Sequence, residues 1–204
     1  DEVTLEERGS SILVSTDFSK NHFEGNFDFA KYPVFLVDRM IARIYEMGYD
    51  KVTIRYSSPE QLKQIEKRIP ELMGFEIVES DKNTIVVQSI SSHSPLEFDN
   101  IIRKAFLVAK DMFEQIVVNM EKNDMENLLE VRADDLKLNK FSYFCLRQLN
   151  KHIVGGNEVY VLFYLSKALE DLGDILKRFI TDQHSMGTVN KDVLKTFKDI
   201  QSLF

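Results

Sequence analysis

The sequence contains one cysteine, Cys145, no tryptophan, eight glycines and four prolines. A single cysteine excludes an intrachain disulfide, and its helical, aromatic neighbourhood favours a small buried core residue over a reactive thiol. Long apolar runs are also missing: the longest, residues 159–165, is far shorter than the roughly 20 residues of a transmembrane helix. No charged-then-apolar signal segment opens the chain. We therefore expect a cytoplasmic protein without membrane insertion.

The chain carries more acidic than basic residues, with 33 Asp and Glu against 26 Lys and Arg and a net charge of −7. This balance excludes a surface that attracts nucleic acid or anionic lipid overall, so any such contact must be local. With 44% hydrophobic residues among 204, the chain is long enough and apolar enough to bury a sizeable core.

The first residues predict a β-hairpin. Val3 and Leu5 alternate with polar residues, residues 8–11 have turn chemistry, and residues 12–14 begin a return strand. Two strands are not stable alone. The chain begins without methionine, inside what resembles the second half of a small β module, and we expect residues upstream of it. We assign residues 1–18 to this hairpin.

Residues 19–92 predict an α+β linking domain, with helices packed on a small sheet. Gly48 is expected to end its first helix. No phosphate-binding loop, Cys/His cluster or nucleophile elbow occurs in it, which favours a packing or dimerisation module over a ligand site. The expected elements are a strand at 23–29, a helix at 34–45, a strand at 52–56, a helix at 59–71 and strands at 75–77 and 85–87.

Residues 93–204 predict an all-α region, because apolar residues recur there at three- and four-residue spacing. Asn123 and Asp124 break the first helix, whose four-three spacing is typical of the seam of a helical bundle. Gly173 would cost about 1 kcal/mol inside a helix, which suggests close approach of another helix, with drift at an exposed position as the alternative. The first seam contains Phe98, Ile102, Ala105, Ala109, Met112, Ile116 and Met120. Helices are expected at 125–151, with Leu136 among its inward residues, at 158–181 and from 190.

Carboxylates recur one helical turn apart in this region. Glu170 and Asp174 share one helix face, and Asp135 and Asn139 have the same spacing on the preceding helix. Facing helices would bring oxygen ligands together for a divalent or ferric cation, and the lack of histidine in these segments favours hard cations over zinc. The alternative is a solvated, charged face, which neighbouring lysines and Arg178 also favour.

Two stretches carry a family resemblance: ADDLKLNKFSYFCLRQL and YLSKALEDLGDILKRF. They resemble the helical repeat of the PhoU family of phosphate uptake regulators, while DEVTLEERGSSILV resembles the AbrB/SpoVT-type hairpin of archaeal proteins that join the two. The resemblance implies an antiparallel PhoU-like helical bundle after the α+β region. It also implies a metal site at Asp135, Asn139, Glu170, Asp171 and Asp174. Asn139 and Asp171 depart from the family's usual aspartate and arginine.

The function implied by this resemblance is non-enzymatic regulation of phosphate uptake and phosphate signalling. The protein would act through contacts with the phosphate transporter or its signalling partner. It would be a homodimer formed by the helical seam and the middle domain. No catalytic or cofactor-binding residue is assigned, since no general base or nucleophile accompanies the carboxylates. The alternative is a DNA-binding transcriptional repressor whose AbrB-like head lies largely upstream of residue 1.

Overall fold

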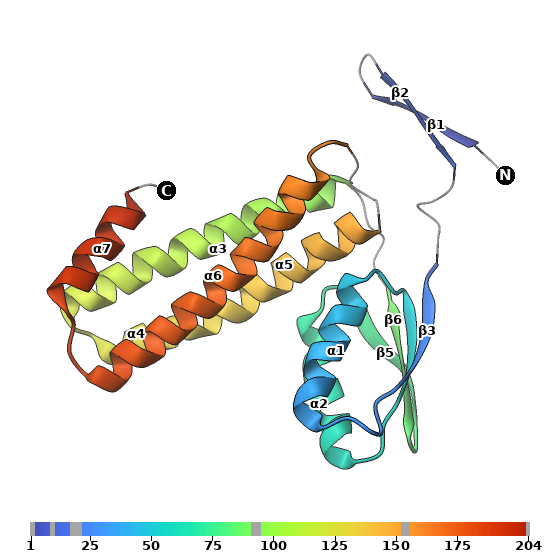
Figure 1. Ribbon diagram of the computed structural model, residues 1–204, viewed down its shortest axis with the longest axis horizontal. Coiled ribbons are helices and arrows are strands. Elements are labelled where there is room, and N and C mark those ends of the chain that lie inside the picture. The colour runs from blue at the N-terminus through green and yellow to red at the C-terminus, as the bar shows by residue number, and fades with distance from the viewer. Residues whose placement is uncertain (1–2, 9–10, 17–21, 91–94, 152–155, 203–204) are drawn as a thin grey trace. The chain divides into compact units, whose positions relative to one another are not determined.

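The computed structural model describes residues 3–8, 11–16, 22–90, 95–151 and 156–202. The chain forms two compact units (Figure 1). The α+β unit consists of Asp1–Ser94 and Arg147–Gly156, and the helical unit consists of Pro95–Leu146 and Asn157–Phe204. The fold is thus an α+β region followed by a helical region, with one short segment returning to the first unit.

The strands of the α+β unit form a hairpin and a mixed sheet. The expected hairpin is confirmed, because Val3 pairs with Thr16 and Arg8 with Ser11 in antiparallel register. In the four-stranded sheet the order is β3-β4-β6-β5, with β3 and β4 parallel and the other pairs antiparallel. The strands are β1 (Val3–Arg8), β2 (Ser11–Thr16), β3 (Glu24–Asp28), β4 (Lys51–Arg55), β5 (Phe75–Asp81) and β6 (Thr84–Ser89).

Helices α1 (Val34–Glu46) and α2 (Pro59–Arg68) lie on the same side of this sheet (Figure 1). Gly48, with φ of +91°, follows the end of α1 as expected. Ser58 begins α2 by accepting a hydrogen bond from the Gln61 backbone N–H at 3.3 Å. A 3-10 turn, η2 (Ile69–Glu71), follows α2. Apolar residues of both helices, of η2 and of alternate strand positions form the core, including Val37, Ile41, Tyr45, Val52, Ile54, Ile65, Ile69, Phe75, Ile85 and Val87.

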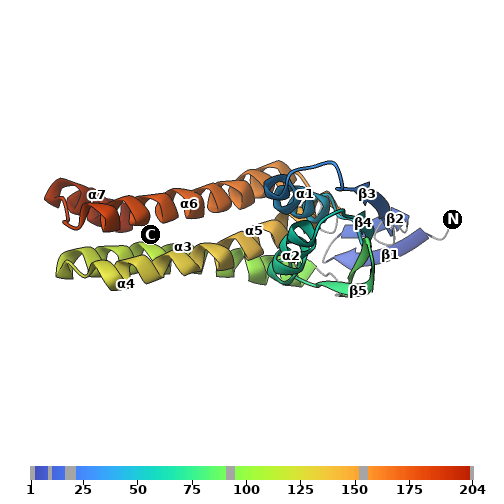
Figure 2. The same ribbon diagram turned by 90° about the horizontal axis from the view of Figure 1, so that it is seen from below.

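The helical unit contains one more break than the sequence predicts. The helix expected at 125–151 is interrupted, because a 3-10 turn, η3 (Val131–Ala133), separates α4 (Met125–Glu130) from α5 (Asp134–Asn150). The helix expected at 158–181 continues to residue 186. Figure 2 shows α6 and α7 along one side of the unit and α3, α4 and α5 along the other. The other helices are α3 (Pro95–Lys122), α6 (Val159–Met186) and α7 (Lys191–Gln201).

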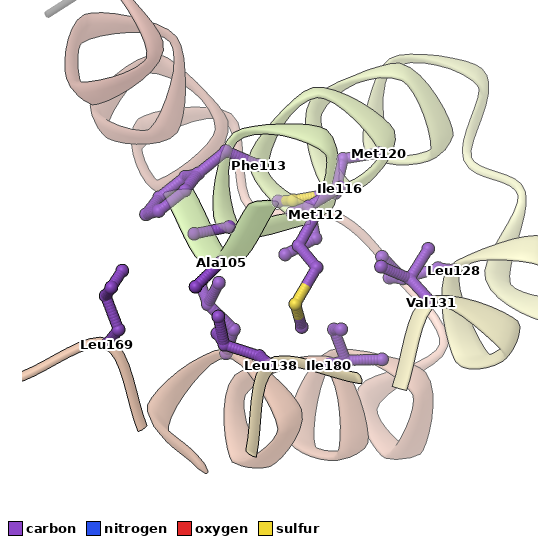
Figure 3. Close-up of a cluster of buried hydrophobic side chains, with 12 residues drawn as sticks. Ala105, Met112, Phe113, Ile116, Met120, Leu128, Val131, Leu138, Leu169 and Ile180 are labelled. Atoms are coloured by element: carbon purple, nitrogen blue, oxygen red, sulfur yellow. The ribbon is translucent and has the colours of Figure 1, made fainter. Parts of the chain in front are cut away.

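The core of the helical unit lies around the seam of α3 (Figure 3). Most of this seam is already buried within one chain, so it is not free to form the dimer contact expected of it. Leu136, expected to point inward, is 50% exposed. The buried cluster contains Ala105, Ala109, Met112, Phe113, Ile116, Met120, Leu128, Val131, Leu138, Leu169, Leu176 and Ile180.

The last turn of α5 belongs to the α+β unit, where Arg147 is fully buried. Its guanidinium donates to the backbone carbonyls of Tyr45 at 3.0 Å and Tyr49 at 2.6 Å. It also donates to Asp50 Oδ1 at 2.8 Å. Lys151 Nζ binds the same carboxylate at 2.6 Å and 2.5 Å. Burial lowers the pKa of Arg147, and the negative charge of Asp50 is among the effects that oppose this shift. This cluster therefore holds residues 147–151 in the α+β unit.

Candidate functional site

The predicted ligands on α5 meet α6 at a buried polar contact. Asp135, in the first turn of α5, is fully buried. Its Oδ2 accepts a hydrogen bond from Lys177 Nζ of α6 at 2.6 Å and a longer one from Asn139 Nδ2 at 3.3 Å. A buried carboxylate requires such a partner, because an unpaired buried charge is costly. The Lys177 ammonium therefore neutralises Asp135 directly.

Gly173 makes this close contact possible. A Cβ at this position would lie 2.9 Å from Asp135 Oδ1 and 3.1 Å from Leu138 Cδ2. Any larger residue would have to displace α5 or the carboxylate. The expected close approach of another helix at Gly173 is thus confirmed, and the alternative of drift at an exposed position is wrong.

The predicted ligands on α6 lie in different surroundings. Glu170 is largely buried, accepts a 3.4 Å hydrogen bond from the Tyr143 hydroxyl and pairs with Lys167. The side chain of Asp171 is 60% exposed and lies 3.1 Å from Lys167 Nζ. Asp174 is exposed. The structure therefore brings together only Asp135 and Asn139 of the predicted ligands. Glu170 and Asp171 pair with Lys167 instead. Asp174 takes part in neither group.

These residues do not fit a metal ion as they stand. Within the described ranges, no group of three or more His, Cys, Asp or Glu side chains is placed to hold one. Oδ1 of Asp135 and Oδ1 of Asn139 are buried without hydrogen-bond partners. However, Lys177 already supplies the positive charge next to them, and an ammonium and a metal ion would compete for the same carboxylate. The metal site predicted from the spacing remains a prediction that this arrangement does not favour.

Sequence reasoning missed a cationic hollow beside this contact. Its lining consists of Arg132 of η3 and Asp174, Lys177, Arg178 and Thr181 of α6. Three positive side chains therefore surround one carboxylate, the reverse of what a cation site requires. The signal in the sequence was the adjacent pair Lys177 and Arg178, but the contribution of Arg132 depends on how η3 packs against α6.

Cys145 is a core residue, as predicted, with 1% of its surface exposed. Burial raises the pKa of its thiol from near 9 to about 12, and a hydrogen bond with Ser166 partly opposes this shift. At pH 8 the native thiolate fraction should be about one in ten thousand, and the thiolate is the reactive form. We expect Ellman's reagent to label urea-unfolded protein within minutes and native protein at least a hundredfold more slowly. Equal rates would contradict this burial.

In the ranges that the structure describes, no helix combines the length and apolar character needed to cross a bilayer.

Comparison of the chain with protein-family models, curated proteins and solved structures finds no match. The fold alone describes the protein as an α+β unit joined to a helical unit. A function for this protein must therefore be argued from its sequence motifs and from the side-chain contacts described above.

Proposed function

We propose that this protein is a cytoplasmic, homodimeric, non-enzymatic regulator of phosphate uptake, whose helical unit is an antiparallel bundle of the PhoU type. It acts by contact with the phosphate transporter or with the transporter's signalling partner. Its effect on phosphate uptake then depends on the complementarity of its surface to that partner, and it catalyses no reaction.

The observation that carries this proposal is the meeting of the two PhoU-like motifs. The residues from Asp135 to Asn139 lie on α5, and the residues from Leu169 to Asp174 lie on α6. Gly173 of the second motif lies against Asp135 of the first. Motifs that are remote in sequence but face each other across one helix pair are consistent with a repeat of this family.

Exposed apolar residues at the start of α6 support a mechanism based on protein contacts. Tyr160 is 87% exposed and Tyr164 is 72% exposed, and both lie one turn apart on one helix face. Val161 and Phe163 beside them are exposed as well. Clustered apolar side chains of this kind are typical of protein interaction sites.

Gene disruption in the source organism tests the proposal. Uptake of labelled inorganic phosphate at high external phosphate should rise several-fold when the gene is disrupted, because a negative regulator has been removed. The wild-type gene should restore low uptake, and a Tyr160→Asp, Tyr164→Asp double variant should not. Tyr32→Asp, which alters an exposed tyrosine in the α+β unit, serves as the matched control and should restore it. Unchanged uptake after disruption would refute the proposed function.

The hairpin gives less support to the alternative of DNA binding. Residues 1–16 contain Asp1, Glu2, Glu6 and Glu7 against the single positive charge of Arg8. DNA affinity depends mainly on Lys and Arg contacts to phosphate. The acidic hairpin therefore favours regulation through protein contacts.

A further inference from the structure

We propose that the hollow lined by Arg132, Asp174, Lys177, Arg178 and Thr181 binds a small oxyanion of the phosphate type. Three of its five side chains are cationic in a chain whose net charge is −7. Acidic residues outnumber basic ones in the chain, 33 to 26, whereas this hollow has three cations and one carboxylate. The local charge of the hollow is therefore opposite in sign to the net charge of the protein.

Two of the cations lack carboxylate partners in the described part of the chain. Arg132 Nε is buried without a hydrogen-bond partner. Arg178 Nε donates only to the backbone carbonyl of Asp174, at 3.3 Å. Lys177, in contrast, pairs with Asp135. The charge of Lys177 is therefore balanced by Asp135, while no carboxylate of the described residues balances the charge of Arg132 or Arg178.

The chemistry of these groups suits a tetrahedral oxyanion. A guanidinium presents planar pairs of N–H donors that bind two oxygens of a phosphate at once. Arg132 comes from η3 and Arg178 from α6, so the two groups approach the hollow from different elements. Thr181 adds a hydroxyl oxygen that already donates its proton to the Lys177 carbonyl at 2.7 Å. The ligand's charge would thus be met mainly by the two arginines.

Substitution of Asp174 is expected to change oxyanion affinity in the direction opposite to substitution of the arginines. Its carboxylate lines the same hollow and repels an anion. Removing this charge should strengthen oxyanion binding, whereas removing either arginine should weaken it. If the hollow instead bound a cation, removing the Asp174 charge would weaken binding.

The test is a calorimetric titration of the full chain with inorganic phosphate, repeated with chloride at the same ionic strength. We expect a phosphate dissociation constant on the order of millimolar, as befits a few half-exposed charge-assisted contacts. Arg132→Met and Arg178→Met should each weaken binding at least tenfold, and Asp174→Asn should tighten it several-fold. Arg103→Met, at an exposed arginine of α3 outside the hollow, should leave it unchanged.

A second titration uses a phosphoserine peptide, which separates two sources of the same chemistry. Tighter binding of inorganic phosphate identifies a free ion as the ligand, and tighter binding of the peptide identifies a phosphorylated partner. Either result supports the oxyanion site if the three variants respond as stated. Absence of phosphate binding, or variants with unchanged affinity and unchanged circular dichroism, overturns it. The result is independent of the proposed function, because uptake in cells is measured separately.

Discussion

Arg147→Met is expected to lower the free energy of unfolding of the α+β unit by about 3–5 kcal/mol, the range for removing one partner of a buried charge pair. Methionine is close in size but has no donor, so the carbonyls of Tyr45 and Tyr49 lose their partners. The contacts of the guanidinium with the Tyr45 and Phe75 rings, at 5.0 Å and 5.1 Å from the ring centroids, are lost as well. Lys151 remains with Asp50, which limits the loss.

Hydrogen exchange measured by mass spectrometry tests whether the loss of stability in Arg147→Met lies in the α+β unit. Amides of β4 and β6 should exchange much faster in Arg147→Met than in the wild type, since exchange of core strands follows the free energy of unfolding. Arg39→Met, at an exposed position of α1, is the matched control and should change exchange little. Arg147→Lys should lie between the two, because it keeps the charge but not the forked geometry. Wild-type exchange in Arg147→Met would show that the cluster adds nothing to stability.

Lys177→Met is expected to destabilise the helical unit by about 3 kcal/mol, because it leaves the fully buried Asp135 carboxylate without a countercharge. The amide of Asn139, at 3.3 Å, is a weak substitute. Adding Asp135→Asn to the variant should recover about 2 kcal/mol, since a neutral amide is less costly to bury.

Urea unfolding followed by helical circular dichroism measures both variants. Lys104→Met, an exposed lysine of α3, is the control and should shift the midpoint little. If the single Lys177 variant and the double variant have equal midpoints, Lys177 is not the countercharge of Asp135.

The sequence predicts the elements of this fold well wherever local signals determine them. Gly48, Pro59, and Asn123 with Asp124 mark helix ends through backbone geometry or capping that depends on neighbouring residues alone. The prediction for Leu136 was wrong because η3 intervenes: a 3-10 turn advances about 120° per residue instead of 100°, so the helix after it presents a different face.

The candidate site was less predictable because its chemistry depends on the register between helices. The spacing of Asp135 and Asn139 placed both on one face correctly, and they form a hydrogen bond. No local signal showed that Lys177, 42 residues from Asp135, would occupy the position of a cation. The same holds for Arg147 and Asp50, which lie 97 residues apart.

The return of residues 147–156 to the α+β unit makes that unit discontinuous in sequence. During synthesis the sheet and its two helices leave the ribosome first, but the Arg147 side chain that binds the end of α1 follows only after the whole of 95–146 has been made. Closing so long a loop delays the final contact and raises the contact order of the unit. We expect the nascent α+β unit to remain incomplete until α5 emerges, so that pausing of translation before residue 147 would prolong its exposure to proteases and chaperones.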